Sequence, residues 1–269
     1  MTDEPPLLSS WKLKLNWAGH HRAQLMLGLE RWLVLDQGAA LVVTEEGHHH
    51  QVCRFRLLKP MPRELSLHVG DCVHNARQAL DHLAYALSIK ITGSNPPTNE
   101  FTSEFPLFTS VRDGNQGRFD NSLERKVGAN KEGLDAIDPA IYTELERCQP
   151  YHGGDMEILA ALDALDRIDK HRFLPVVAGV GVVGNWTFSN MVLGGMPRLI
   201  AQGPVEDDTI VAEWISDPMY NGGVQAKLDT MLLFAKDSTV LPEAIVLNVL
   251  HNILSRIGGD IIPRIERLL

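Results

Sequence analysis

The 269-residue sequence contains only three cysteines, Cys53, Cys72 and Cys148, and they lie far apart. No two of them have the C-x-x-C spacing of a zinc site or a redox pair, and their odd number favours a reducing compartment. The first ten residues lack the basic and then apolar segments of a secretory signal. No run of eighteen or more apolar residues is present, so we expect no membrane-spanning helix and no membrane partner. These absences predict a cytoplasmic protein.

The sequence also lacks an excess of positive charge. Lys and Arg number 25 against 34 Asp and Glu, which gives a formal net charge of -9. This balance argues against a broad basic surface for duplex DNA or an anionic membrane. With 44% hydrophobic and 22% charged residues the composition is that of a globular protein, and a chain of this length needs no disulfide or structural metal to fold.

Hydrophobic periodicity and capping residues predict an α+β fold. The expected helices cover residues 10–35, 63–91, 138–148 and 155–172, and a final helix runs from Pro242 to the Gly258-Gly259 pair. A β-hairpin is expected at 39–58, loops and one short helix at 98–135, and antiparallel strands at 176–236. The fold is then a helical core with an N-terminal β-hairpin and a C-terminal antiparallel β-rich stretch plus a final helix. Residues 1–175 and 176–269 form two regions or one continuous domain.

The stretch from Gly179 to Gly184 has the letters of the dinucleotide-binding pattern G-x-G-x-x-G. In that motif a helix follows the glycines and directs its N-terminus at the pyrophosphate. Here the following residues, Asn185 to Phe188, favour a strand. We therefore expect a glycine-containing strand and turn instead of a nucleotide site.

The expected helix 63–91 carries an unusual polar face. At about 100° per residue, its polar side chains fall within one arc of about 160°, opposite an apolar arc. The polar residues are Asp71, His74, Asn75, Arg77, Gln78, Asp81, His82 and Tyr85. Between residues 71 and 85 this face has neither Lys nor Glu, the usual residues of a solvated helix face, and its groups form hydrogen bonds of fixed geometry. The alternatives are a functional site, the ordinary solvated face of an amphipathic surface helix, and an internal hydrogen-bond network.

A second group of charged residues lies at the end of the expected helix 155–172. Asp169 and Arg172 fall on the same side of this helix as its leucines, so both are expected to face the protein interior. Buried charges are paired or functional. We expect this helix to pack beside helix 63–91 and to bring Asp169 and His171 close to the polar face, where His20 or His21 can join them.

A metal-dependent hydrolase is one alternative for these groups. Its ligands would be His74, Asp81, Asp169 and His171. The first two are seven residues apart, about 10.5 Å along a helix, so ligands from the second helix would be required. Another alternative is a non-enzymatic binding or scaffold protein, in which the polar face is a buried network.

The spacing of Arg77 and His82 suggests a different site. Five residues turn a helix by about 140°, so the two side chains diverge on one chain. In a homodimer, Arg77 of one chain can approach His82 of the other. Arg77 would bind a phosphate and His82 would act as a general base.

The segment Arg77-Gln-Ala-Leu-Asp-His82 resembles the Arg-x4-6-His motif of HEPN-domain ribonucleases. The resemblance implies a dimer that cuts RNA without a metal or other cofactor, in stress or phage defence. Arg77 would stabilise the phosphate charge and His82 would activate a ribose 2′-hydroxyl. His74 and Asp81 complete the candidate catalytic group, and the candidate substrate-binding residues are Asn75, Gln78, Asp169, His171 and Arg172.

A broader likeness covers roughly residues 10–175. Its motifs are Gly70-Asp71-x-x-His74-Asn75-x-Arg77-x-Ala79-Leu80-Asp81-His82-Leu83, then Phe105-Pro106, Gln149-Pro150-Tyr151 and Asp169-Lys170-His171-Arg172. These motifs are similar to those of a group of bacterial proteins of uncharacterised function, so this likeness implies no activity.

Overall fold

The protein has an α+β fold with antiparallel sheets. The computed structural model describes residues 9–46, 49–98, 101, 103–109, 119, 123, 126–127, 137–180, 186–189, 198–201, 203–204, 206–215, 223–226 and 230–269. The chain divides into two compact units, each discontinuous in sequence. Unit 1 contains residues 1–23, 68–174 and 248–269, and unit 2 contains residues 24–67 and 175–247. The N-terminal hairpin therefore belongs to the same unit as the C-terminal strands.

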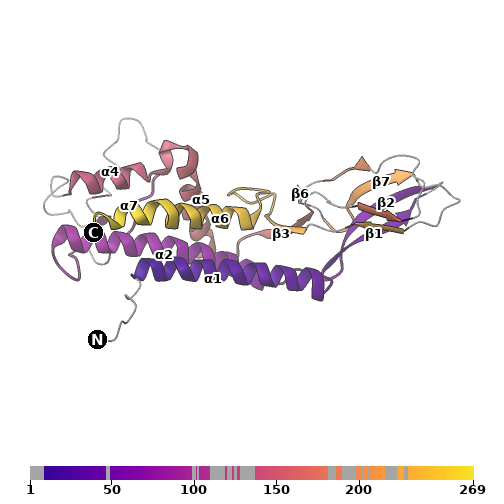
Figure 1. The fold of residues 1–269 in the computed structure, drawn as a ribbon, viewed down its shortest axis with the longest axis horizontal. Coiled ribbons are helices and arrows are strands. Elements are labelled where there is room, and N and C mark those ends of the chain that lie inside the picture. Colours follow the sequence, from indigo (N-terminus) through magenta and orange to yellow (C-terminus); the bar gives the residue numbers. More distant parts are fainter. Residues whose placement is uncertain are drawn as a thin grey trace. The chain divides into compact units, whose positions relative to one another are not determined.

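Unit 1 contains helical segments from both ends of the chain. Its helices come from α1 (Ser10–Glu30), α2 (Glu64–Thr92), α4 (Pro139–Arg147), α5 (Glu157–Asp169), α6 (Val246–Arg256) and α7 (Ile262–Glu266). Helices α1 and α2 are antiparallel neighbours (Figure 1), and Arg22 of α1 lies near Cys72 while Lys14 lies near His82. Among the described residues, no helix is long and apolar enough to cross a membrane.

Several helix boundaries agree with the sequence-based predictions. Helix α2 matches the expected 63–91, and α1 continues as a π-helical turn, Arg31–Leu35, to the expected end. At α4 the Asp138 side chain accepts a hydrogen bond from the backbone N–H of Ala140 at 2.8 Å, as an N-cap residue does. The expected segment 98–135 lies largely outside the described residues.

The final helix differs from the prediction at both ends. Pro242 precedes it, and α6 begins at Val246. The Gly258-Gly259 pair does not end it, because the chain continues through a π-helical turn, Ile257–Ile261, into α7. A Cβ at Gly258 would lie 2.8 Å from Cδ2 of Leu15, so glycine here allows close packing against α1.

Unit 2 is built mainly from strands. Strands β1 (Ala39–Glu45) and β2 (His50–Leu57) form the expected hairpin, which β7 (Ile210–Ile215) and β5 (Arg198–Leu199) extend into a sheet of order β1-β2-β7-β5. A second sheet has the order β6-β3-β9, from Gly203–Pro204, Val176–Val180 and Thr230–Phe234. Strand β4 (Trp186–Ser189) pairs with β8 (Gly223–Ala226).

The glycine pattern at 179–184 leads into a strand. Gly179 and Val180 are the last residues of β3, and Trp186 begins β4. The intervening residues 181–185 lie outside the described residues. Residues 186–189 form a strand, as predicted, whereas a dinucleotide site needs a helix after its glycines.

Helices α2 and α5 pack closely at Gly70. A Cβ on Gly70 would lie 2.0 Å from Oδ1 and 2.5 Å from Cγ of Asp169. Only a residue without a side chain fits this contact, so Gly70 sets how near α5 approaches the first turns of α2.

We predict that Gly70→Ala destabilises the protein by about 1–3 kcal/mol, because the new methyl group displaces Asp169 or separates the helices. Gly19→Ala is the control, since no atom lies within 4 Å of a Cβ at that helical position. In the control the free energy of unfolding should stay unchanged or rise by up to about 1 kcal/mol, because alanine has a higher helix propensity than glycine. Urea unfolding measures both changes, and a Gly70→Ala variant as stable as Gly19→Ala would contradict the packing argument.

Candidate functional site

Arg77, the predicted phosphate-binding residue, is buried in α2 with 3% of its surface exposed. Nη1 lies 3.2 Å from Oδ1 of Asp81, Nη2 lies 2.8 Å from Oε1 of Glu104, and Nε lies 3.7 Å from Oδ1 of Asp163. Nη2 also donates a hydrogen bond to the carbonyl oxygen of Phe105 at 3.0 Å. The guanidinium charge is therefore balanced within the chain.

The carboxylates around Arg77 have further partners of their own. Oδ1 of Asp81 accepts a hydrogen bond from the backbone N–H of Phe105 at 3.0 Å. Burial raises the pKa of Asp81, while the charge of Arg77 and this hydrogen bond oppose the rise. Burial alone would also raise the pKa of Glu104, but its bonds to Lys126 and Arg77 hold that pKa below its usual value. These contacts make an internal ion-pair network that ties α2 to α5 and to the segment 103–109.

The network does not favour Arg77 as a phosphate ligand, because a substrate would have to replace contacts that the chain already supplies. Arg77 and His82 diverge on α2 as predicted: Arg77 faces α5, and His82 lies near Lys14 of α1. The ribonuclease hypothesis, with its homodimer, gains no support from these contacts and stays a prediction.

His74 belongs to a separate pair with α5. Its Nδ1 lies 2.9 Å from Oδ1 of Asp166, and its Nε2 lies 2.7 Å from Nε2 of Gln78. Asp166 is 3% exposed and also pairs with Lys170 at 2.7 Å. Both imidazole nitrogens of His74 are thus engaged in the fold. Asn75 is similarly occupied, since its side chain donates to the carbonyl oxygen of Asp71 at 2.8 Å.

The end of α5 corrects the predicted orientation of Arg172. Helix α5 ends at Asp169, three residues earlier than expected, and both His171 and Arg172 are exposed. Outside the helix the periodicity that placed Arg172 in the interior no longer applies. Asp169 does lie against α2, and burial raises its pKa, with Asp71 and Asp166 adding to the rise.

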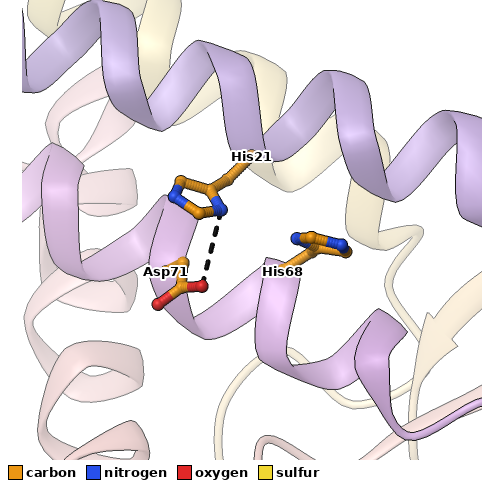
Figure 2. Close-up of side chains that lie close together, drawn as sticks. All are labelled: His21, His68 and Asp71. Atoms are coloured by element: carbon orange, nitrogen blue, oxygen red, sulfur yellow. Dashed lines mark ion pairs between the residues drawn. The ribbon is translucent and has the colours of Figure 1, made fainter.

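The strongest candidate site is a cluster of His21, His68 and Asp71 (Figure 2). His21 comes from α1, whereas His68 and Asp71 occupy positions i and i+3 of α2. One ligand-type atom from each residue can be chosen so that all three lie within 4.8 Å of one another. Nδ1 of His21 is 3.4 Å from Oδ2 of Asp71. This arrangement matches the helical spacing at which two side chains reach one metal ion.

The imidazoles of this cluster are incompletely satisfied. Nδ1 of His21 and Nδ1 of His68 are buried and have no hydrogen-bond partner. Burial lowers the pKa of His21; the neighbouring imidazoles lower it further, and Asp71 opposes them. A neutral imidazole offers a lone pair to a metal ion. The Asp71 side chain is 55% exposed, so the cluster is open to solvent on that side.

Among the described residues, this cluster is the one set of three or more metal-ligand side chains that converge. The predicted metal ligands His74, Asp81, Asp169 and His171 do not form such a group. His21 was anticipated as a possible member, and Asp71 as part of the polar face, but His68 was missed. The signal that could have found His68 is the His-x-x-Asp spacing at 68–71.

A cavity of about 640 Å³ lies elsewhere in unit 1, between the end of α4 and the C-terminal helices. Two of the arginines that line it are part-buried and already paired: Arg256 with Asp155 and Asp260, and Arg264 with Asp260 and Glu144. The charges of these two arginines are therefore already met within the chain.

Comparisons with known proteins give no further guide: no family model matches the chain, and no curated protein or solved structure matches it significantly.

We predict that Arg77→Ala lowers the free energy of unfolding by about 3 kcal/mol, because it leaves the partly buried carboxylates without their counter-charge. Arg167→Ala is a matched control: Arg167 also pairs with Asp163, at 2.6 Å, but its side chain is 72% exposed. That loss should stay below about 1 kcal/mol. Urea unfolding compares the two variants, and equal small losses would show that Arg77 is not a structural residue.

His82 should make stability depend on pH. Burial and then the charge of Lys14 lower its pKa below 6.5, although Asp81 opposes the shift. The unfolded chain therefore binds this proton more tightly, so the free energy of unfolding falls as the pH drops below about 6.5 and levels off below the folded pKa. His82→Gln should flatten this part of the profile, and Lys14→Gln should flatten it partly. Unfolding between about pH 7.5 and about pH 5 tests this, and an unchanged profile for His82→Gln would refute it.

Proposed function

We propose that the protein is a metal-dependent hydrolase that holds a divalent ion between His21, His68 and Asp71. The observation that carries this proposal is that one nitrogen from each of two imidazoles and one carboxylate oxygen lie within 4.8 Å of one another. Beside them, Nδ1 of His68 is buried without a hydrogen-bond partner, and Nδ1 of His21 has only the 3.4 Å ion pair with Asp71. Buried polar atoms without partners each cost about 1–3 kcal/mol. One bound cation would satisfy all three groups.

The set of donor atoms fits Zn²⁺ or a similar ion. Two imidazoles and one carboxylate supply three ligands, which is the number that catalytic zinc sites use. Zinc ligands lie about 2.0–2.2 Å from the ion, so atoms now within 4.8 Å must draw together by about an ångström. Rotation of the half-exposed Asp71 side chain supplies part of this movement, and neither helix has to unfold.

Hydrolysis follows from the coordination position that three protein ligands leave for water. An ion in such a site lowers the pKa of its bound water toward neutrality. In the reaction the water oxygen would bond to the electrophilic carbon or phosphorus, the bond to the leaving oxygen or nitrogen would break, and the water proton would end on the leaving group. His21 and His68 would hold the ion, and the exposed side of Asp71 would give the substrate access.

We predict that the full-length protein, treated with a chelator and then dialysed against Zn²⁺, retains about one zinc per chain. His68→Ala and His21→Ala should lose it, because each removes a ligand. His20→Ala is the control, since His20 neighbours His21 but lies outside the cluster. Elemental analysis measures the metal, and zinc at about 100 times its Kd should raise the free energy of unfolding by about 2.7 kcal/mol in wild type and in His20→Ala, but not in His68→Ala or His21→Ala.

Zinc retention and stabilisation that are the same in His68→Ala as in wild type would overturn the metal site. Hydrolysis is scored separately with phosphoester and carboxylester substrates. If the protein binds zinc but hydrolyses none of these substrates in a zinc-dependent way, the metal site stands and the hydrolase assignment is overturned.

A further inference from the structure

An exposed tryptophan lies beside the proposed metal site. Trp17 of α1 is 54% exposed. Its ring stacks on His20 with 4.8 Å between centroids and an interplanar angle of 15°, and it meets His21 edge-on at 5.5 Å. The ring of His21 in turn lies 5.8 Å from that of His68. A continuous series of aromatic rings therefore leads from the proposed ion to solvent.

Trp17 is exposed enough to contact another planar ring. His20 stacks on the indole, His21 meets it edge-on, and no other aromatic ring contacts Trp17 among the described residues. Stacking of a nucleobase on an aromatic side chain contributes about 1–3 kcal/mol and tolerates any base, because every base has a π-face. An indole already fixed by His20 loses little side-chain freedom when such a ring binds.

Two cations of α1 lie close in sequence to Trp17 and His21. Lys14 lies one turn before Trp17, and Arg22 follows His21 directly. Neither forms an ion pair with a carboxylate among the described residues, and the buried Nε of Arg22 has no hydrogen-bond partner. A divalent ion would offset the negative charges of Asp71 and the neighbouring Asp169, and Lys14 and Arg22 add positive charge on α1. A phosphate bound there would meet favourable charge.

We infer that the substrate is a nucleotide, with its base stacked on Trp17 and its phosphate at the ion held by His21, His68 and Asp71. This assignment rests on the proposed metal site. The overall negative charge of the chain opposes a long polyanion, so a free nucleotide is favoured over a nucleic-acid strand. Both sources share the chemistry of a base and a phosphate separated by one sugar.

The test measures binding of AMP and ribose 5-phosphate to the zinc-loaded full-length protein by calorimetry. The two ligands share the sugar and phosphate and differ in the base. AMP should bind about tenfold more tightly, which corresponds to about 1.4 kcal/mol of stacking. Trp17→Ala should abolish this preference and Trp17→Phe should retain part of it. Arg22→Gln should weaken the binding of AMP and of ribose 5-phosphate by the same factor.

Leu13→Ala is the matched control, because Leu13 is also 54% exposed and lies one turn from Trp17 on the same helix. It should leave the preference for AMP unchanged. A short oligoadenylate forms the second arm: weaker binding than AMP supports a free nucleotide, and tighter binding overturns that choice in favour of a single strand.

Zinc content is measured in every sample, so the two proposals fail in different ways. Protein that binds zinc but does not distinguish AMP from ribose 5-phosphate, or that distinguishes them equally well after Trp17→Ala, overturns the nucleotide inference alone. Protein that retains no zinc overturns the metal site, and the nucleotide inference with it.

Discussion

A guanidinium can remain in a protein interior only where acceptors meet its charge and its fixed set of donors. Arg77 imposes this requirement on the centre of α2. Asp81 on the same helix, Asp163 on α5 and Glu104 on the segment 103–109 all lie within ion-pair distance of it. The burial of one side chain thereby fixes which segments lie against α2. It also explains why this part of the polar face packs against the chain instead of facing solvent.

This requirement separates two parts of α2. From His74 to Asp81 the polar groups are committed to contacts with α5 and the segment 103–109, and a ligand would have to displace them. One to two turns earlier, His68 and Asp71 face α1, where His21 lies opposite. Gly70 lies between these two residues and allows Asp169 to approach without a clash. The ion-pair network and the proposed metal ligands thus lie on successive turns of α2.

The sequence predicted the helices wherever local signals act alone. Asp138 and Pro139 mark the start of α4, and the apolar periodicity of 63–91 gives the extent of α2. The predicted helix end at Gly258-Gly259 was wrong, because close packing of Gly258 against Leu15 outweighed the preference of glycine for helix ends. Arg172 was misplaced because a helical wheel assumes that the helix continues, and α5 ends before it.

The candidate site was harder to predict, since it depends on contacts between distant segments. The unusual composition of the polar face left a functional site and an internal network open, because composition cannot distinguish a guanidinium paired within the chain from a free one. The carboxylates that neutralise Arg77 include Glu104 and Asp163, which are far from it in sequence and carry no motif. His21 becomes relevant only because α1 and α2 are antiparallel and bring positions 21 and 71 side by side.

Buried polar atoms without hydrogen-bond partners can be donors or acceptors, and only acceptors can bind a cation. This distinction favours a cation at the histidine cluster. The indole nitrogen of Trp32 is also buried without a hydrogen-bond partner, but it is a donor, which no metal ion can satisfy. The cluster offers imidazole lone pairs and a carboxylate, and all of these are acceptors when the histidines present their unprotonated nitrogens. A water molecule has only two protons to donate to three acceptors. A divalent ion accepts all three lone pairs and also neutralises the carboxylate, so it satisfies the cluster where a single water cannot.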